Sequence, residues 1–368
     1  MGKFLQRSRL ALQDSTLKRP RWAFETAREP APLWLDKNEN FDDELSKLTT
    51  KLLSQLSPKA INTYPELGSL YKKLASWVGV GAECLVLTAG SDGAIRSVFD
   101  AFIEPGDLVV HTSPTFAMYP IYCQIYGAKT KLLKYRGDKK GPQLELSEVL
   151  AAIKSNNVKL LCLPNPDSPT GTVFTPDEME EILRCALAEE VLVLVDEAYH
   201  PYYFSSVVPL LSKFPNLIVA RTFSKAWGLA GARVGYSIAN GEISEILNKV
   251  RAMYEVGALG ASLVEAMLPF GDAMLASVER VKAGRLYFGN EMQKLGFNVL
   301  QSEGNFIHVA FGSQGHSVHE ALKGKVLYRL DSKEECLSGF SRFTVAPTGT
   351  MKGIVDCVDL ACAVKHRL

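Results

Sequence analysis

A lysine and an aspartate each follow a strongly apolar segment, and their side chains could together carry imine chemistry. Lys225 follows one such segment, and a lysine becomes an imine-forming nucleophile when burial or a nearby cation lowers its pKa. Asp196 closes the apolar run Val191–Val195, where a buried carboxylate needs a cationic partner such as a protonated pyridine nitrogen. Each residue also has a plain alternative. Lys225 could be a solvent-facing loop lysine, and Asp196 a helix N-cap beside a packed Tyr199.

Several polar groups stand at fixed intervals from these two residues. Tyr199 is three residues after Asp196 and could donate a hydrogen bond to a ring oxygen. Arg233 is eight residues after Lys225 and could both lower the pKa of the lysine and bind phosphate oxygens. The hydroxyl groups of Thr222 and Ser224 could bind the same dianion.

Two further segments suggest a phosphate site and a stacking ring. Gly90, Ser91 and Asp92 open a predicted helix, where backbone N–H groups bind phosphate and glycine permits close approach. A plain helix cap is the alternative. Phe116 could stack on a planar cofactor, although a core phenylalanine is the default interpretation.

The elements that must position these residues alternate along the chain from about residue 80. The apolar runs that predict buried strands are Leu85–Thr88, Leu108–Thr112, Val158–Leu163, Val191–Val195, Leu217–Ala220 and Val234–Ile238. The periodic stretches that predict helices are Ser91–Ile103, Pro176–Glu190 and Glu242–Tyr254. This alternation favours an α/β fold with a mainly parallel sheet, which binds ligands beyond its strand carboxyl ends. Because the candidate residues follow such runs, we expect them to share one site.

The pattern changes after about Met267. It predicts the helix Val278–Leu295 and the strands Phe306–Phe311, Val326–Arg329 and Phe343–Val345. We interpret this part as a smaller α+β domain that part of the N-terminal segment joins. The expected divisions are an arm with part of the small domain at 1–45, a large domain at 46–265 and a small domain at 266–368.

Composition excludes several classes of function. The 368 residues carry a net charge of +1 and are 47% hydrophobic, which gives no electrostatic case for nucleic acid or a charged membrane surface. We find no apolar run long enough to span a bilayer. The seven cysteines form neither a CxxC motif nor a pattern with histidine, so we expect no metal site and a reduced, cytoplasmic protein.

Together these residues resemble the fold-type I pyridoxal-phosphate (PLP) aminotransferases of class I/II, and most of all the histidinol-phosphate aminotransferase group. The resemblance covers about Trp34 to Ala363. It rests on the segments Leu35-Asp36-Lys37-Asn38-Glu39-Asn40, Asn62-Thr63-Tyr64-Pro65-Glu66, Ala89-Gly90-Ser91-Asp92, Pro114-Thr115-Phe116-Ala117-Met118-Tyr119, Asp196-Glu197-Ala198-Tyr199, Arg221-Thr222-Phe223-Ser224-Lys225 and Leu229-Ala230-Gly231-Ala232-Arg233.

The resemblance implies a role for each residue. The large domain would hold a mainly parallel seven-stranded sheet, with Lys225 binding the cofactor as a Schiff base and moving the proton. Asp196 would pair with the pyridine nitrogen, Tyr199 would bond the phenolate oxygen, and Phe116 would stack. The implied phosphate-side residues are Gly90, Ser91, Asp92, Thr222, Ser224 and Arg233, together with Tyr64 from the other subunit of a homodimer.

The resemblance also implies substrate contacts. Arg342 would grip the anionic end of the substrate, and Asn40 lies in a matching motif. Arg329, thirteen residues before Arg342, matches a second anion-binding arginine of the group. The alternative for Arg329 is a surface ion pair with Asp331 or Glu334.

Two departures bear on the site and the substrate. Where the family reads Asn-Pro-Asn-Asn-Pro-Thr-Gly, residues 165–171 put Ser168 in place of the asparagine that donates to the phenolate oxygen. Phe41-Asp42 stands where the group has proline followed by an aromatic residue and glycine, so the substrate entrance differs.

Three functions remain open at this point. They are an aminotransferase acting on glutamate and a small phosphorylated carbonyl compound, a PLP decarboxylase of a phosphorylated amino acid (threonine-phosphate decarboxylase-like), and a binding module without catalysis. The retained Lys225 argues against the last.

Overall fold

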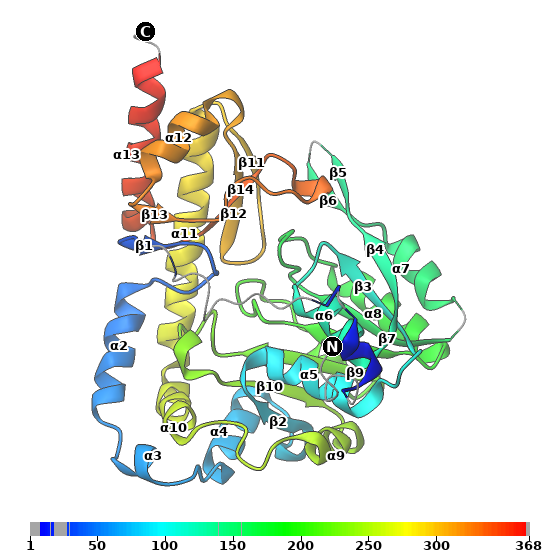
Figure 1. Cartoon of the computed structure of the whole chain (residues 1–368). Helices are drawn as coiled ribbons and strands as arrows, with labels where there is room; N and C mark the ends of the chain where they lie inside the picture. The colour runs from blue at the N-terminus through cyan, green and yellow to red at the C-terminus, as the bar shows by residue number, and fades with distance from the viewer. Residues whose placement is uncertain are drawn as a thin grey trace.

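A seven-stranded sheet in the order β2-β10-β9-β8-β7-β3-β4 forms the centre of the computed structural model (Figure 1). The structure describes residues 8–14, 16–17, 28, 30–138, 140–155 and 157–365. The strands are β2 (Leu85–Thr88), β3 (Leu108–Ser113), β4 (Lys129–Lys134), β7 (Val158–Pro164), β8 (Leu192–Asp196), β9 (Leu217–Thr222) and β10 (Gly235–Ala239). β10 runs antiparallel to β2 and β9, and the other neighbours pair in parallel. The mainly parallel α/β fold that we expected is confirmed.

The central strands are apolar along their whole length because both faces of the sheet are covered. In β7, Leu161 and Leu163 pack into one core, whereas Leu160 and Cys162 pack into another. One core receives side chains from α7 (Leu146–Ile153) and α8 (Pro176–Ala188). The other receives them from α5 (Gly90–Phe102), α6 (Met118–Tyr126) and α9 (Gly241–Val250). This is the two-sided burial that continuous apolar runs indicate.

The sequence missed the edge strand β4 and misplaced the ends of two helices. The helix expected over Val278–Leu295 begins earlier, at Gly271. β4 reads Lys-Thr-Lys-Leu-Leu-Lys and is largely exposed, as suits an edge strand that charged residues protect from further pairing. The helix expected over Glu242–Tyr254 ends at Val250, because Arg251 adopts an extended conformation.

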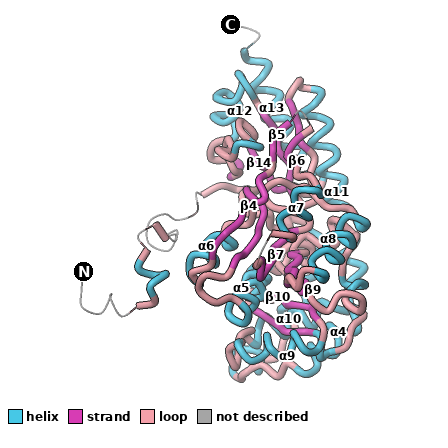
Figure 2. Tube along the Cα trace, turned by 90° about the vertical axis from the view of Figure 1, so that its right-hand side faces the viewer, coloured by secondary structure: helices cyan, strands magenta, loops and turns pink. Residues whose placement is uncertain are grey.

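A second, three-stranded antiparallel sheet lies in the C-terminal part of the chain. It consists of β11 (Asn298–Leu300), β12 (Phe306–Ala310) and β14 (Ser341–Thr344), with α11 (Gly271–Lys294), α12 (Gly315–Leu322) and α13 (Thr348–Lys365) nearby (Figure 2). β1 (Leu33–Trp34) pairs in parallel with β13 (Val326–Leu327), so the N-terminal segment joins this part. The domain boundaries at residues 45 and 265 stay a prediction.

The remaining elements connect these two sheets or lie beside them. They are α2 (Asp43–Ser54), α3 (Lys59–Asn62), α4 (Gly68–Val78), α10 (Ala258–Met267) and the hairpin of β5 (Arg136–Asp138) and β6 (Gly141–Gln143).

One helical stretch corrects the expectation that no run is long enough to span a bilayer. Ala258–Lys294 is long and apolar enough by length and composition alone, with a mean hydropathy of 1.3 over its best window. In the structure this stretch is divided into α10, a short 3-10 turn and α11, and 39% of the window is buried. α10 packs on α2 and α4, and α11 packs on α13. Core helices of this kind pass the same test of composition.

Gly235 sets how closely β10 approaches the start of α5. It pairs with Thr88 on one side and Thr222 on the other, at the sheet edge where β2 and β9 end. A Cβ atom at this position would lie 2.3 Å from the carbonyl carbon of Gly90 and 2.5 Å from the nitrogen of Ser91. Both are backbone atoms, so any side chain would displace the first turn of α5.

We therefore expect Gly235→Ala to lower the free energy of unfolding by about 1–3 kcal/mol, the usual cost of overpacking, as measured by urea denaturation. Gly231→Ala is the matched control because nothing lies within 4 Å of its Cβ position. Equal stability of the two variants would contradict this account of the β10–α5 contact.

Candidate active site

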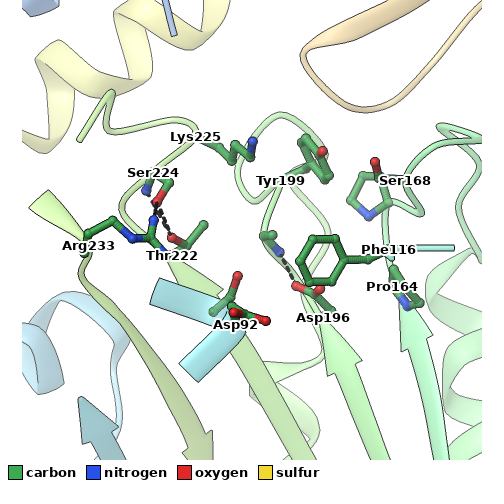
Figure 3. Close-up of a pocket in the computed structure, with 13 residues that line it drawn as sticks. Asp92, Phe116, Pro164, Ser168, Asp196, Tyr199, Thr222, Ser224, Lys225 and Arg233 are labelled. Carbon is green, nitrogen blue, oxygen red and sulfur yellow. Dashed lines mark hydrogen bonds between the residues drawn. The ribbon is translucent and has the colours of Figure 1, made fainter. Parts of the chain in front are cut away.

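A cavity of about 200 Å³ lies beyond the carboxyl ends of β7, β8 and β9 (Figure 3). Ten of the predicted site residues line it, together with Pro164, Pro166 and Ala198. The ten are Ser91, Asp92, Phe116, Ser168, Asp196, Tyr199, Thr222, Ser224, Lys225 and Arg233. The sheet edge therefore brings together side chains that are spread over more than a hundred positions of the sequence.

Asp196 is a buried carboxyl group that forms no ion pair with any of the described residues. Its side chain accepts hydrogen bonds from the Ala198 backbone N–H at 3.0 Å and from the Tyr119 hydroxyl at 3.4 Å. Burial, with smaller contributions from the nearby Asp92 and Glu197, raises the pKa of Asp196 to about 7. No helix follows Asp196, since the next residues form turns, so the N-cap alternative fails. A cationic group in the cavity would stabilise this carboxylate.

Lys225 projects into the same cavity and its amine is held by the backbone. Its Nζ donates to the carbonyl oxygen of Lys37 at 2.8 Å. Burial lowers the pKa of Lys225, and the nearby Arg342 lowers it further, against the opposing effect of Tyr199. A lysine with a lowered pKa is more often neutral and hence nucleophilic at physiological pH.

One end of the cavity gathers donors for an anion. Arg233 Nη1 lies 3.5 Å from Ser224 Oγ, and Thr222 Oγ1 lies 2.9 Å from the same oxygen. Gly90 has φ +78°, and a Cβ atom there would lie 2.7 Å from Arg233 Nη2. Glycine is therefore needed for the guanidinium group to reach the start of α5. Arg233 itself adopts φ +53°, a left-handed conformation that is uncommon for arginine.

Asp92 can serve an anion only through its backbone. Its carboxylate accepts a hydrogen bond from the Tyr122 hydroxyl at 2.9 Å. A carboxylate would repel a phosphate, whereas the N–H groups of Ser91 and Asp92 in the first turn of α5 attract one.

Phe116 and Tyr199 form aromatic walls of the cavity. Phe116 is 36% exposed and contacts Tyr119 edge-on at 6.2 Å, so it is not the core residue of the default interpretation. Tyr199 is buried, packs edge-on against Phe306 at 5.4 Å, and its hydroxyl accepts a hydrogen bond from Asn38 Nδ2 at 2.8 Å. Ser168 lines the cavity as well.

The two candidate substrate arginines meet at one backbone oxygen. Arg329 Nε and Arg342 Nη2 donate to the carbonyl oxygen of Asp36 at 3.2 and 3.1 Å. The two residues also pair through their backbones. Among the described residues Arg329 forms no ion pair with Asp331 or Glu334. The alternative of a surface ion pair is therefore not what the structure contains.

Five predicted site residues are not part of the cavity lining, and two of them, Asn40 and Tyr64, contact other parts of the chain. Asn40 Nδ2 donates to the Ala226 carbonyl and to Ser277 Oγ, both at 3.0 Å, so its amide holds neighbouring segments together. Tyr64 is 71% exposed and stacks on Tyr254 at 4.2 Å, at a second cavity of about 350 Å³. Substrate binding by Asn40 and cofactor binding by Tyr64 stay predictions.

The sequence did not reveal three groups that contact the site residues. Tyr119 donates to Asp196, and the only signal for it was its position three residues after Phe116. Asn38 donates to Tyr199, and the carbonyl oxygen of Lys37 accepts from Lys225. Both belong to the segment Leu35–Asn40, but no local pattern assigns them a partner.

Asp167 is a second buried carboxyl group beside the site. It is fully buried and accepts a hydrogen bond from the Tyr135 hydroxyl at 2.9 Å. Burial, with a smaller contribution from the charge of Asp196, raises the pKa of Asp167 to about 7. Among the described residues no group of three His, Cys, Asp or Glu side chains is placed to hold a metal ion.

Comparison with known proteins identifies relatives along most of the chain. The family model described as aminotransferase class I and II matches residues 30–358. The chain is 33% identical to the histidinol-phosphate aminotransferase of Thermoanaerobacter pseudethanolicus over 85% of this chain and 88% of that protein. It is also 33% identical to that of Caldanaerobacter subterraneus subsp. tengcongensis, over 91% of this chain and 94% of that protein.

Solved structures share the fold at lower identity. The histidinol-phosphate aminotransferase of Sinorhizobium meliloti, in complex with pyridoxal-5'-phosphate, superposes with a TM-score of 0.82 at 22% identity and covers 97% of this chain and 98% of that chain. L-threonine-O-3-phosphate decarboxylase from Porphyromonas gingivalis superposes with a TM-score of 0.75 at 19% identity, over 89% of this chain and 98% of that chain.

Asp167→Asn tests the burial of this carboxyl group. Because its folded pKa of about 7 exceeds the ordinary value of 3.8, the native state holds more protons than the unfolded state between about pH 4 and pH 7. The contribution of Asp167 to stability therefore falls as pH rises through that window. Asparagine does not titrate and can still accept from Tyr135. We expect the variant to gain on the order of a few kcal/mol in unfolding free energy at pH 8 and much less at pH 5, measured without cofactor.

The matched control is Asp356→Asn, which removes an exposed carboxylate from α13. It should show no such difference between the two pH values. An equal gain for Asp167→Asn at pH 5 and pH 8 would show that Asp167 is ionised throughout.

Proposed function

The chain belongs to the class I and II aminotransferases, and from that premise we propose that it moves an amino group from an amino acid, glutamate, to a small phosphorylated carbonyl compound. As a member of this family it is a PLP-dependent transaminase. The observation that carries the proposal is one cavity lined by Lys225, Asp196 and Arg233, which are the amine, the buried anion and the anion receptor that this chemistry needs.

The donor set fits the three polar parts of PLP. Arg233, Ser224 and Thr222 would bind the phosphate, next to the first turn of α5. The buried carboxyl group of Asp196 would face the ring nitrogen, and Lys225 would hold the aldehyde carbon through its amine. When bound, PLP supplies an electron sink for the electrons released at the substrate α-carbon.

The surrounding residues keep that chemistry in place. Asp196 holds a proton on the ring nitrogen, because protonation of the ring relieves the cost of its own burial. Lys225 Nζ moves the proton to and from the α-carbon of the substrate, and its lowered pKa favours the neutral amine that accepts a proton. Tyr199 would donate its hydroxyl hydrogen to the phenolate oxygen of the cofactor, and Phe116 would stack on its ring.

The substrate's anionic groups would be bound by Arg342 and Arg329. Both guanidinium groups turn toward the Asp36 carbonyl, and Arg342 Nε is buried without a hydrogen-bond partner among the described residues. Burial lowers the pKa of Arg342, and the charge of Arg329 lowers it further. An incoming anion would relieve this repulsion and satisfy the free N–H group.

A homodimer would complete the site. Tyr64 lies on an exposed apolar surface with Ile61, Tyr254 and Leu259, which are 77%, 48% and 44% exposed. Exposed apolar patches of this kind mark protein interfaces. In such a dimer Tyr64 would reach the cofactor phosphate of the other subunit across an isologous interface.

We also propose a cytoplasmic location. All seven cysteines are free in the structure, as expected for a protein in a reducing compartment.

The wild-type protein with PLP should be yellow, and glutamate should convert the bound cofactor to its colourless amine form. Lys225→Ala should lose the borohydride-trapped linkage and slow turnover at least about a hundredfold, because no amine remains to hold the cofactor and move the proton. Lys213→Ala, at an exposed lysine 3.5 Å from Glu180, is the control and should behave as wild type. Release of CO2 from a phosphorylated amino acid without a response to glutamate would instead favour the decarboxylase.

Arg329→Ala should raise the KM for the phosphorylated substrate about ten- to a hundredfold, since one charge-assisted contact is lost. The rate of the glutamate half-reaction should be unchanged, because glutamate needs only Arg342 to bind its α-carboxylate. Arg184→Ala, at an exposed arginine of α8, controls for the loss of positive charge. An unchanged KM for every phosphorylated substrate would contradict the second-anion assignment.

Mixing inactive Lys225→Ala subunits with weakened Tyr64→Ala subunits should restore activity to about a quarter of the wild-type level. Random pairing would give half mixed dimers, each with one intact site of two. The measurement is the steady-state rate after unfolding and refolding the mixture. An active monomer on a sizing column would contradict the shared site.

A further inference from the structure

Asn38 holds the hydroxyl group of Tyr199 through a buried side-chain contact. Its Nδ2 donates to the Tyr199 hydroxyl oxygen at 2.8 Å, and the residue is 2% exposed. Asn38 has φ +56°, a left-handed conformation that asparagine tolerates better than most residues. The backbone is therefore turned at this point in a way that directs the amide toward Tyr199.

The neighbours of Asn38 fix which way its amide points. Thr344 Oγ1 accepts from the Asn38 backbone N–H at 2.8 Å, so its single hydrogen is free to be donated to Asn38 Oδ1, 3.3 Å away. The amide oxygen therefore faces Thr344 and the NH2 group faces Tyr199. Asn305 Nδ2 also donates to the Asn38 carbonyl oxygen at 3.1 Å, which holds the backbone in place.

This arrangement leaves the hydrogen of Tyr199 free. The hydroxyl oxygen accepts from Asn38, and no acceptor for its hydrogen occurs among the described residues. Because Tyr199 lines the cavity, the hydrogen can be donated only toward the cavity or to water in it. In the view of Figure 3, Tyr199 lies between Lys225 and Ser168.

We propose that Asn38 is a positioning residue that directs the Tyr199 hydroxyl hydrogen at the phenolate oxygen of the cofactor. The proposal rests on the proposed function. The direction of the Tyr199 hydroxyl hydrogen is more important with Ser168 than with asparagine at that position. The serine hydroxyl reaches less far toward the phenolate oxygen than the asparagine amide does. Tyr199 is then the main donor to the phenolate oxygen, and Asn38 sets its orientation from outside the cavity.

The readout is the pH midpoint of the visible absorption band of the bound cofactor, which measures proton loss from its linkage to Lys225. Donation to the phenolate oxygen lowers this midpoint, because it withdraws electron density from the group that otherwise holds the proton. The other titratable groups that interact electrostatically with Tyr199 are Lys225, whose Nζ is 5.7 Å from its ring centroid, Arg342 and Tyr202. They are unchanged in every variant.

Asn38→Asp keeps the shape of the side chain and its tolerance of positive φ but replaces the donor with an acceptor. Tyr199 would then donate to the introduced carboxylate, and the midpoint should rise. The added negative charge by itself also raises the pH midpoint. The effect of Asn38→Asp is therefore measured both in the wild-type protein and in a Tyr199→Phe background. We expect a rise about one pH unit larger when Tyr199 is present.

Two further variants separate this role from a general effect on the segment. Asn38→Gly removes the donor without charge or backbone strain and should raise the midpoint by a smaller amount, again only with Tyr199 present. Asn305→Asp places a carboxylate beside the same segment without touching Tyr199, and its effect should be equal in both backgrounds. Equal shifts for Asn38→Asp with and without Tyr199 would overturn the positioning role alone. A wild-type protein that binds no PLP would overturn the proposed function with it.

Discussion

The burial of the Asp196 carboxyl group is the constraint around which the site is arranged. A carboxylate at the end of a covered strand loses its hydration, and only one backbone N–H and one distant tyrosine hydroxyl replace it. This loss of hydration raises the pKa of Asp196 to about 7. A cationic ring nitrogen removes the cost of this burial, so the same burial that destabilises the empty protein favours binding of the cofactor.

The strand ends could be predicted from the sequence, whereas the contacts between distant segments could not. Apolar runs locate buried strands, and parallel strands bring the residues just beyond their carboxyl ends to one edge, so Asp196 and Lys225 were predicted to share a site. The edge strand β4 was missed because its lysines hide the apolar pattern. Asn38 was missed because its partners, Tyr199 and Thr344, lie 161 and 306 positions away, and no local rule encodes such pairings.

One short segment contacts four polar side chains at or beside the site. The carbonyl oxygen of Asp36 accepts from Arg329 and Arg342, that of Lys37 accepts from Lys225 Nζ, and the amide of Asn38 donates to Tyr199. Backbone carbonyl groups carry no sequence signal, so three consecutive residues can organise a site while only one of them does so through its side chain.

The pairing of β1 with β13 has a consequence for synthesis of the protein. Residues 33–38 are made long before the residues that they contact, because Leu33 pairs with Val326 and the Asn38 backbone N–H donates to Thr344 Oγ1. The central sheet can close once Ala239 has been made, because all seven of its strands precede that point. The nascent chain can therefore carry a folded sheet with an unfinished site, and β1 has no pairing partner until Val326 and Leu327 have been made.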